Sequence, residues 1–361
     1  MYGTTMVQDK HIPLIIPCYE PDDRLISLLQ ALADNGFNNI VLVNDGSSSE
    51  YDHYFSDAQN IYNCTILNHV ENLGKGRALK DAFNYCLDYD TELIGCVTAD
   101  SDGQHTPEDI ALVMNSLKEN PDNLILGCRD FSKDNIPKKS YLGNTITRKV
   151  CKFLCGVNVS DTQTGLRGIP KNFMSEALDI PGERFEFETR MLINSKGAYD
   201  ITEIPIETVY DSAENHQTHF DPLRDSIRIY KIFGWIFLKF IISSLSSSVL
   251  DLILFHLFCG VFKDIYTAAY ITIATVIARI ISATYNYTIN YAFVFHSKEK
   301  KSTSLTKYAL LAITQMFLSA ALVTLGAHII PVSHEVIIKI IVDTVLFFIS
   351  YYIQRTLVFK R

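Results

Sequence analysis

Up to about residue 220, the chain alternates short apolar runs with stretches in which apolar residues recur at helical spacing. The apolar runs have the length of buried strands and cover residues 11–17, 39–44, 64–67, 93–99 and 123–127. The stretch after the first run shows the helical spacing clearly, with Leu25, Leu28, Leu29 and Leu32. Strands that alternate with helices predict an α/β domain with a mostly parallel, doubly wound sheet.

After Trp235, the pattern changes to long apolar runs with few charges. Four stretches can each span a bilayer and predict an all-α domain of four transmembrane helices, at about 235–258, 267–290, 307–330 and 336–356. Lysines gather in the connection 296–307, whereas the other two connections hold only Lys263. By the positive-inside bias, we expect a multi-pass protein of the cell membrane whose soluble domain and both termini are cytoplasmic.

The two apolar hairpins also repeat each other. At a constant offset, Tyr287, Ile289, Val294 and Phe295 are matched by Tyr351, Ile353, Val358 and Phe359. Charges deep in a span are costly and usually mark a partner or a pathway, and this chain has Asp251, Arg279 and Asp343. Asp251 and Arg279 fall near the middles of consecutive antiparallel spans. We expect them to pair, either as a structural ion pair or beside a path for a polar group.

Composition and charge narrow the class of partner. The 361 residues suffice for two domains. The formal net charge is −8 and no basic patch is interleaved with aromatic residues, so we expect no nucleic-acid partner. The eight cysteines have neither metal-site nor disulfide spacing, which indicates reduced thiols. The start of the chain has no basic region followed by an apolar one, so we expect no signal peptide.

Polar side chains follow several predicted strands at the point where each strand ends, namely Glu20, Asp45, Asp100 and Arg129. In α/β folds ligands bind at this edge of the sheet, so the pattern predicts a nucleotide site there. Asp100, Asp102 and Gln104 stand at alternate positions and offer oxygen ligands. Such ligands suit Mg²⁺ or Mn²⁺, which complete their shells with substrate phosphates. A D-x-D motif by itself is equally typical of a solvated acidic turn.

Gly74, Lys75 and Gly76 form a glycine-rich turn before a stretch of helical spacing. The turn is not a P-loop, because the spacing G-x-x-x-x-G-K-[ST] is missing. Taken alone, the turn therefore indicates the start of a helix.

Seven motifs occur in order within about residues 10–230: IPCYEPDDRL, VLVNDGSSSE, NLGKGRAL, TADSDGQHTPEDI, LGCRDFS, DTQTGLRGIP and FEFETRML. This order resembles the family 2 glycosyltransferases, in the branch of dolichol-phosphate mannose synthase and bacterial polyprenyl-phosphate glucosyltransferases. The resemblance implies a Rossmann-like nucleotide-sugar-binding domain that works with a divalent metal.

The resemblance also implies roles for individual residues. Asp45 would read the base or ribose, although the family often has two acids where this chain has Asn44 and Asp45. Arg129 and Arg148 would be catalytic by placing the acceptor phosphate, while Arg167 is equally consistent with a structural role. The metal would be held by Asp100, Asp102 and Gln104, with Asp102 also catalytic. The nucleotide pocket would be lined by Pro17, Tyr19, Glu20, Asp45 and Asp100.

The nature of the nucleophile decides which catalytic groups are needed. A sugar hydroxyl needs a general base, for which Glu186 or Glu188 is available. A lipid monophosphate arrives largely ionised, since its second pKa lies near about 6. It needs cationic guides instead, and the planar fork of arginine suits a phosphate. A single displacement at one donor site inverts the anomeric centre.

Two amphipathic stretches indicate helices that lie in the membrane interface. Residues 137–156 place Ile146, Val150 and Phe153 beside several lysines, and residues 221–235 carry Arg224, Arg228 and Lys231. Anionic lipid headgroups would favour both helices. Ordinary packing against the sheet is the alternative for the first stretch.

The membrane half is similar to the GtrA-like family of four-helix proteins, through its hydropathy, its repeat and the ending NYTINYAFVF. We therefore divide the chain into a cytoplasmic glycosyltransferase domain at 1–220, an interfacial helix at 221–235 and a GtrA-like domain at 236–361. We expect inverting, metal-dependent transfer of a hexose to polyprenyl phosphate, for cell-surface glycan modification. The expected donor is a nucleotide sugar, either a UDP-hexose, with UDP-glucose first, or GDP-mannose. The pattern is also compatible with a homo-oligomer.

Other classes of protein are compatible with part of this pattern. One is a lipid-linked-sugar transporter whose soluble half only delivers or regulates, and another is a glycosyltransferase that acts on a different membrane acceptor. A processive polysaccharide synthase would carry a Q-x-x-R-W motif. The single tryptophan, Trp235, follows Phe233 and Gly234 instead.

Overall fold

The computed structural model describes residues 9–129, 138–207, 224–263, 265, 269–329 and 335–360. The chain divides into two units, Met1–Ile232 and Phe233–Arg361. Each unit has an architecture of its own, an α/β sheet in the first and helices in the second.

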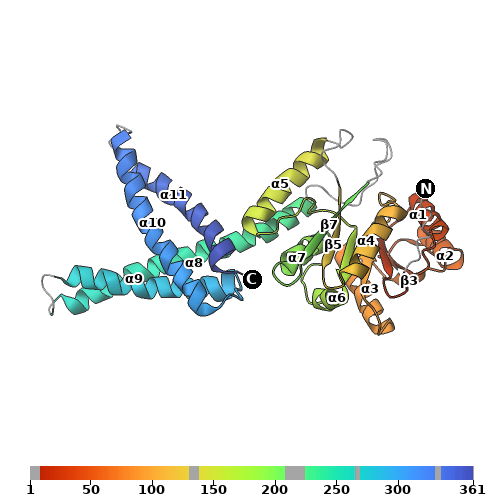
Figure 1. Ribbon diagram of the computed structural model, residues 1–361, viewed down its shortest axis with the longest axis horizontal. Helices are drawn as coiled ribbons and strands as arrows, with labels where there is room; N and C mark the ends of the chain where they lie inside the picture. The colour runs from red at the N-terminus through yellow and green to blue at the C-terminus, as the bar shows by residue number, and fades with distance from the viewer. Residues whose placement is uncertain are drawn as a thin grey trace. The chain divides into compact units, whose positions relative to one another are not determined.

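The first unit is built on a seven-stranded sheet in the order β3-β2-β1-β4-β6-β5-β7 (Figure 1). Neighbouring strands are parallel except that β6 is antiparallel to both β4 and β5. The predicted mostly parallel sheet is therefore confirmed. The strands are β1 (Leu14–Cys18), β2 (Ile40–Asn44), β3 (Thr65–Asn68), β4 (Gly95–Thr98), β5 (Leu124–Arg129), β6 (Arg167–Pro170) and β7 (Ile201–Ile206).

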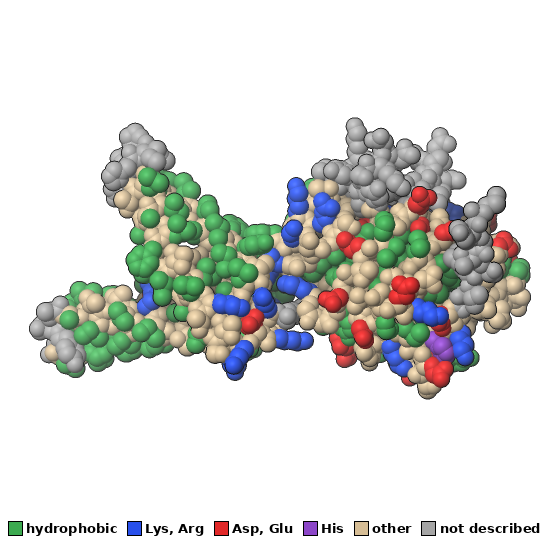
Figure 2. All heavy atoms as spheres, in the orientation of Figure 1, with side chains coloured by type: hydrophobic (Ala, Val, Ile, Leu, Met, Phe, Trp, Pro, Cys, Tyr) green, Lys and Arg blue, Asp and Glu red, His purple; other side chains and the backbone are tan. Residues whose placement is uncertain are grey.

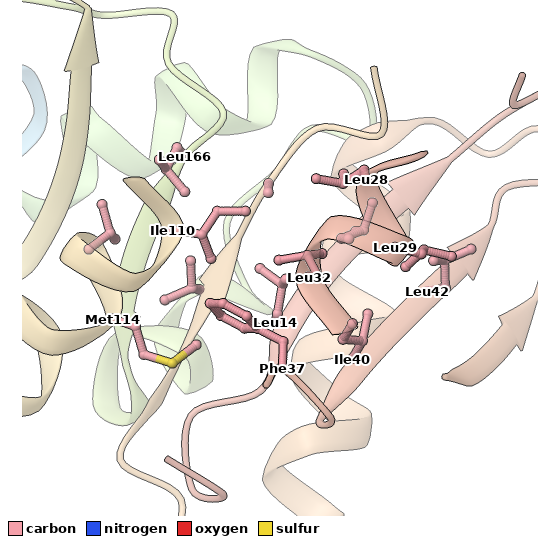
Figure 3. Packing of buried hydrophobic residues seen from close by; sticks show 14 of the residues in the cluster. Leu14, Leu28, Leu29, Leu32, Phe37, Ile40, Leu42, Ile110, Met114 and Leu166 are labelled. Carbon is pink, nitrogen blue, oxygen red and sulfur yellow. The ribbon is translucent and has the colours of Figure 1, made fainter. Parts of the chain in front are cut away.

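Helices cover both faces of this sheet. One face is packed by α1 (Asp23–Asp34), α2 (Asp52–Asn60) and α4 (Pro107–Glu119), and the other by α3 (Lys75–Tyr89), α6 (Lys171–Ala177) and α7 (Glu186–Ser195). The unit also contains α5 (Lys138–Leu154) and the short 3₁₀ turn η1 (Ser49–Tyr51). The leucines of α1 meet the inward side chains of β1 and β2, and Ile110 and Met114 of α4 extend the same core (Figure 3).

The five apolar runs of the sequence each overlap a strand, but β6 and β7 were not anticipated. In β6, a glycine, a proline and the buried Arg167 interrupt the apolar pattern. In β7, most side chains are only partly buried, because this strand lies at the edge of the sheet. Neither strand therefore gives the continuous apolar run that marks a central strand.

The second unit consists of helices: α8 (Arg224–Phe262, which begins in the first unit), α9 (Tyr270–Ile289), α10 (Lys301–Ile329) and α11 (Glu335–Ile353). Among the described residues, three helices are long and apolar enough to cross a membrane: Ser226–Phe262, Lys301–Gly326 and Ile337–Val358. Hydrophobic side chains cover much of their visible surface (Figure 2). The second predicted span corresponds to α9, which carries Arg279 and Asn286, so the count of four spans stays a prediction.

The predicted interfacial helix at 221–235 is not separate from the first span. Residues 221–223 lie outside the described residues, and α8 continues without a break through Trp235, which is exposed. The interfacial position of its first turns stays a prediction.

The hairpin repeat is present in the structure. The second helix of each hairpin ends in a π-helical turn, η2 (Asn290–Val294) and η3 (Gln354–Val358). The amide of Asn290 donates to Oε1 of Gln354 at 3.1 Å, and the rings of Phe295 and Phe359 stack with centroids 5.3 Å apart. Each contact joins a residue to its own counterpart in the other hairpin. The matching ends of the two hairpins therefore contact each other at corresponding positions.

The charges predicted inside the spans have partners. Arg279 Nη2 lies 3.2 Å from Asp251 Oδ2, as expected, and Ser282 Oγ donates to Asp251 Oδ1 at 2.8 Å. Asp343 pairs instead with Lys339 at 2.9 Å, one turn earlier on the same helix, and accepts from Ser319.

Candidate active site at the carboxyl edge of the sheet

Asp45, at the end of β2, fixes the loop that precedes α3. Its Oδ1 lies 2.8 Å from His69 Nδ1 and accepts from the backbone N–H of Leu73 at 3.0 Å. Its Oδ2 accepts from the backbone N–H of Gly74 at 2.9 Å. Both oxygens of this buried carboxylate are therefore engaged within the chain, and its predicted contact with the base or ribose stays a prediction.

The residues predicted to line the nucleotide pocket follow β1, which lies between β2 and β4. Pro17 is buried inside the strand, and Tyr19 and Glu20 come directly after it, partly exposed. Glu20 has a φ of 46°, in the left-handed region that a glutamate seldom adopts, and its N–H donates to Ser47 Oγ at 2.9 Å. Hydrogen bonding to Glu20 raises the pKa of the Tyr19 phenol. A strained residue held by its surroundings is typical of a functional edge.

Asp100 and Asp102 follow β4, next to β1 in the sheet. Burial would raise the pKa of Asp100, but the charges of Lys75 and His105 outweigh it and hold that pKa well below the usual range. The pKa of Asp102 is raised, by burial first and by the charge of Asp100 second. Gln104 approaches this pair through its backbone, whose N–H donates to Asp102 Oδ1 at 3.1 Å.

Lys75 is the cation at this carboxylate pair, and sequence reasoning missed it. Its Nζ lies 2.6 Å from Asp100 Oδ1 and 3.0 Å from Glu188 Oε2. It is the first residue of α3, so the expectation that the glycine turn starts a helix is confirmed. Gly74 has a φ of 104°, and a Cβ there would meet the backbone of Glu183. The sequence signal that could have revealed it is a lysine between two glycines. Glycines lack a Cβ and so allow the start of a helix to approach other segments of the chain closely.

Arg129, at the end of β5, is held by an aspartate that sequence reasoning also missed. Its Nε lies 2.6 Å from Asp161 Oδ2, and its Nη2 donates to Asp161 Oδ1 at 3.1 Å. Asp161 is fully buried and begins the segment DTQTG, which leads into β6. Later in this segment, a Cβ on Gly165 would lie 2.7 Å from Cγ of Asp100. The segment 161–165 therefore touches both the arginine and the carboxylate pair.

The other predicted residues lie apart from this arrangement. Arg148 is on α5, partly exposed, and forms no ion pair with any residue that the structure describes. Arg167 is buried and donates to the carbonyl oxygens of Thr164 and Glu188, so its role is structural. Since the carboxylate of Glu188 pairs with Lys75, it is poorly placed to act as a general base.

The carboxylate pair suits a metal that the substrate helps to hold. Within the described ranges, no three His, Cys, Asp or Glu side chains converge on one point. Mg²⁺ in nucleotide sites commonly takes one or two carboxylates and completes its shell with phosphates and water. Burial first and the charge of Asp100 second raise the pKa of Asp102, and a bound cation would favour its charged form. Asp100 and Asp102 therefore fit a divalent cation shared with a diphosphate.

Comparison with known families decides the class of both halves. Residues 14–177 match the glycosyl transferase family 2 model, and residues 239–359 match the model of the GtrA/DPMS transmembrane domain. The chain joins a family 2 glycosyltransferase domain to a GtrA/DPMS transmembrane domain. This glycosyltransferase is accordingly a membrane-associated enzyme.

Two archaeal proteins and one solved structure illustrate what this chain is similar to. A UDP-N-acetylglucosamine–dolichyl-phosphate N-acetylglucosaminyltransferase of Methanococcus voltae is 27% identical over 226 residues, covering 56% of this chain and 87% of that protein. An uncharacterized protein of Methanocaldococcus jannaschii is 26% identical over 209 residues, covering 56% of this chain and 84% of the relative. S. aureus TarS 1-349 in complex with UDP-GlcNAc has 13% identity and a TM-score of 0.41, covering 95% of this glycosyltransferase and 91% of that chain.

Proposed function

We propose that this glycosyltransferase transfers a hexose from a nucleotide sugar to polyprenyl phosphate at the cytoplasmic face of the membrane, with Mg²⁺ or Mn²⁺ as cofactor and UDP-glucose as donor. One observation carries the proposal: the segment 161–165 contacts both Arg129 and Asp100, the proposed acceptor and donor groups. The Methanococcus voltae relative, named for a dolichyl-phosphate acceptor, supports a lipid phosphate.

The donor side needs positive charge at the diphosphate. A bound divalent cation would neutralise the leaving nucleotide diphosphate and make it a better leaving group. Asp100 and Asp102 would hold this cation, with Gln104 beside them. Tyr19 and Glu20 would line the nucleotide pocket at the end of β1, where the left-handed turn of Glu20 sets their direction.

The acceptor side needs positive charge but no base. A phosphate oxygen of the lipid would attack the anomeric carbon, the bond from that carbon to the donor diphosphate would break, and the nucleotide diphosphate would leave with the electron pair. The lipid phosphate is already ionised, so no proton has to be removed. Asp161 orients the guanidinium of Arg129 toward this role, and Arg148 is a second candidate guide. A single displacement inverts the anomeric centre, so an α-linked donor gives a β-linked product.

The acceptor requires the enzyme to work at a membrane. On α5, the face that packs inward is formed by small side chains, Asn144, Thr147 and Cys151. Ile146 is 45% exposed, with Lys149 and Lys152 exposed near it, and basic side chains are visible over α5 in Figure 2. An outward apolar residue flanked by lysines supports the predicted interfacial position. Tyr141 and Leu142, whose apolar side chains would extend this face by their spacing, lie outside the side chains described.

Synthesis from defined substrates tests the proposal. The full chain in lipid nanodiscs is incubated with polyprenyl phosphate and labelled UDP-glucose, UDP-N-acetylglucosamine or GDP-mannose, with Mg²⁺, with Mn²⁺ or with chelator. We expect a lipid-linked sugar from UDP-glucose, no product in chelator and none from Asp102→Ala. Asp88→Ala, an exposed aspartate of α3, is the matched control and retains activity. Full activity in chelator would exclude the proposed metal dependence. Absence of product with every donor would favour the transporter alternative.

A further inference from the structure

Lys75 lies at the carboxylate pair that is proposed to hold the divalent cation. Its ammonium contacts Asp100, one of the two proposed metal ligands, at 2.6 Å, and it is only 14% exposed. Its second partner, Glu188, lies at 3.0 Å and is not one of those ligands. The backbone oxygen of Glu188 accepts from the buried Arg167 at 2.8 Å, so this second partner is fixed in place.

The position of Lys75 on α3 is electrostatically poor without its two carboxylates. It is the first residue of the helix, where the macrodipole favours an anion over a cation. The first turn contains no acidic residue, and Gly74 offers no side-chain cap. Asp100 and Glu188 therefore supply the attraction that keeps the ammonium here. The start of α3 remains a favourable place for an added anion such as a phosphate.

We propose that Lys75 couples binding of the divalent cation to binding of the nucleotide diphosphate. Without donor, the ammonium neutralises Asp100 and repels a cation from the carboxylate pair. When the diphosphate binds beside the start of α3, its oxygens give the ammonium another anionic partner, and Asp100 becomes available to the metal. Glu188 keeps the lysine within reach throughout. The inference rests on the proposed function, because it needs the metal to share Asp100 and the diphosphate.

The coupling predicts a specific pattern of affinities. By linkage, UDP must raise the affinity for Mn²⁺ by the same factor as Mn²⁺ raises the affinity for UDP. In Lys75→Met, the repulsion is gone, so Mn²⁺ alone binds more tightly than to the natural chain. The donor loses a cationic contact at the same time, so UDP binds more weakly in the presence of metal. The factor by which each ligand raises the affinity for the other is therefore smaller in Lys75→Met than in the natural chain.

The experiment measures Mn²⁺ binding to the full chain in nanodiscs from the loss of the free-ion signal in electron paramagnetic resonance, with and without UDP. For the natural chain we expect UDP to tighten Mn²⁺ binding by about tenfold or more. For Lys75→Met we expect Mn²⁺ alone to bind about tenfold more tightly and UDP to change this by less than about threefold. Lys75→Gln, which keeps a hydrogen-bond donor for Asp100, repeats the test if the methionine variant does not fold.

Lys80→Met is the matched control. Lys80 is also a buried lysine of α3, but its Nζ pairs with Glu183 at 3.1 Å rather than with the carboxylate pair. In Lys80→Met, UDP should raise the affinity for Mn²⁺ by the same factor as in the natural chain. Equal coupling in the Lys75 variants and the natural chain, or UDP-independent Mn²⁺ binding to the natural chain, would overturn the inference and leave the proposed function standing. Failure of Mn²⁺ to bind the natural chain at all, even with UDP, would overturn both.

Discussion

The guanidinium of Arg129 is clamped by the carboxylate of Asp161, with Nε 2.6 Å from one oxygen and Nη2 3.1 Å from the other. The two residues are 32 positions apart in the chain, and Asp161 is fully buried while Arg129 stays 20% exposed. A two-point contact of this kind fixes the plane of the guanidinium. Asp161 therefore sets the orientation in which the guanidinium would meet a phosphate.

Arg129→Ala tests the acceptor role. We expect the KM for polyprenyl phosphate to rise at least about tenfold, because a charge-assisted contact to the phosphate is lost, while UDP affinity stays within about twofold. Steady-state kinetics with each substrate varied, together with UDP binding, measures both effects. If UDP affinity alone fell, Arg129 would belong to the donor site.

Asp161→Asn tests the clamp separately from the arginine. Removing the buried charge leaves Arg129 without its ionic partner and should cost up to about 3 kcal/mol of stability, with impaired use of polyprenyl phosphate. Seven of the eight cysteines are buried in the first unit, so thermal unfolding followed with a thiol-reactive dye reports on that unit. Asp57→Asn, at an exposed position of α2, should change stability by less than about 0.5 kcal/mol. Unchanged acceptor kinetics would show that the clamp does not position Arg129.

Gly165→Ala should disturb the carboxylate pair. A methyl group at this position would lie 2.7 Å from Cγ of Asp100, so the carboxylate must shift. We expect Mn²⁺ binding in the presence of UDP to weaken by about tenfold or more, with the fold retained. Gly143→Ala is the control, because no atom of the described residues lies within 4 Å of a Cβ there and alanine favours the helix. Metal binding equal to that of the natural chain would show that Asp100 tolerates the shift.

Asp9 gives the first unit a small acid-sensitive contribution to stability. A hydrogen bond from Lys118 lowers the pKa of Asp9 below its usual value of 3.8. A carboxyl whose pKa is lowered by folding stabilises the protein above its unfolded-state pKa, and this contribution is lost as the pH falls through the folded-state pKa. Asp9→Asn should therefore cost up to about 1 kcal/mol at neutral pH, and this difference from the natural chain should vanish in acid below about pH 3. Unfolding curves at both pH values measure it, and a difference that persisted in acid would exclude this cause.

The amide pair of Asn290 and Gln354 should stabilise the packing of the two hairpins. Asn290→Ala removes the donor to Gln354 and the donor to Asn286, and should cost about 1 kcal/mol in a membrane protein. Gln354→Ala and the double variant complete a double-mutant cycle. The losses of stability in the two single variants should add up to more than the loss in the double variant. Thr288→Ala, exposed on α9, is the control. Unfolding in mixed micelles followed by circular dichroism measures each step, and strict additivity would show that the pair contributes nothing as a pair.

Local sequence determined the elements and the location of the chemistry. Apolar runs of strand length predicted five strands, of which four lie inside the sheet, where strands are buried on both faces, and β3 lies at its edge. Since parallel strands share a carboxyl edge, the polar residues after those runs also predicted where Asp100 and Arg129 would gather. Long apolar stretches predicted the membrane helices, and the constant offset between the hairpins predicted their repeat. Each of these signals is a local period or length, which the backbone geometry of helices and strands imposes directly.

Tertiary structure alone decided which distant segments touch. It inserted β6 antiparallel between β4 and β5, and so carried the segment 161–165 to both Arg129 and Asp100. It brought Lys75 to Asp100 and to Glu188, which come from two distant parts of the chain, and it turned Asp45 inward to hold a loop. A buried aspartate or lysine leaves no mark in the local pattern of apolar residues. Its partner depends on the crossovers between strands and on how the helices pack. The partners of these charges are therefore set by the packing of the whole domain, which no window of sequence contains.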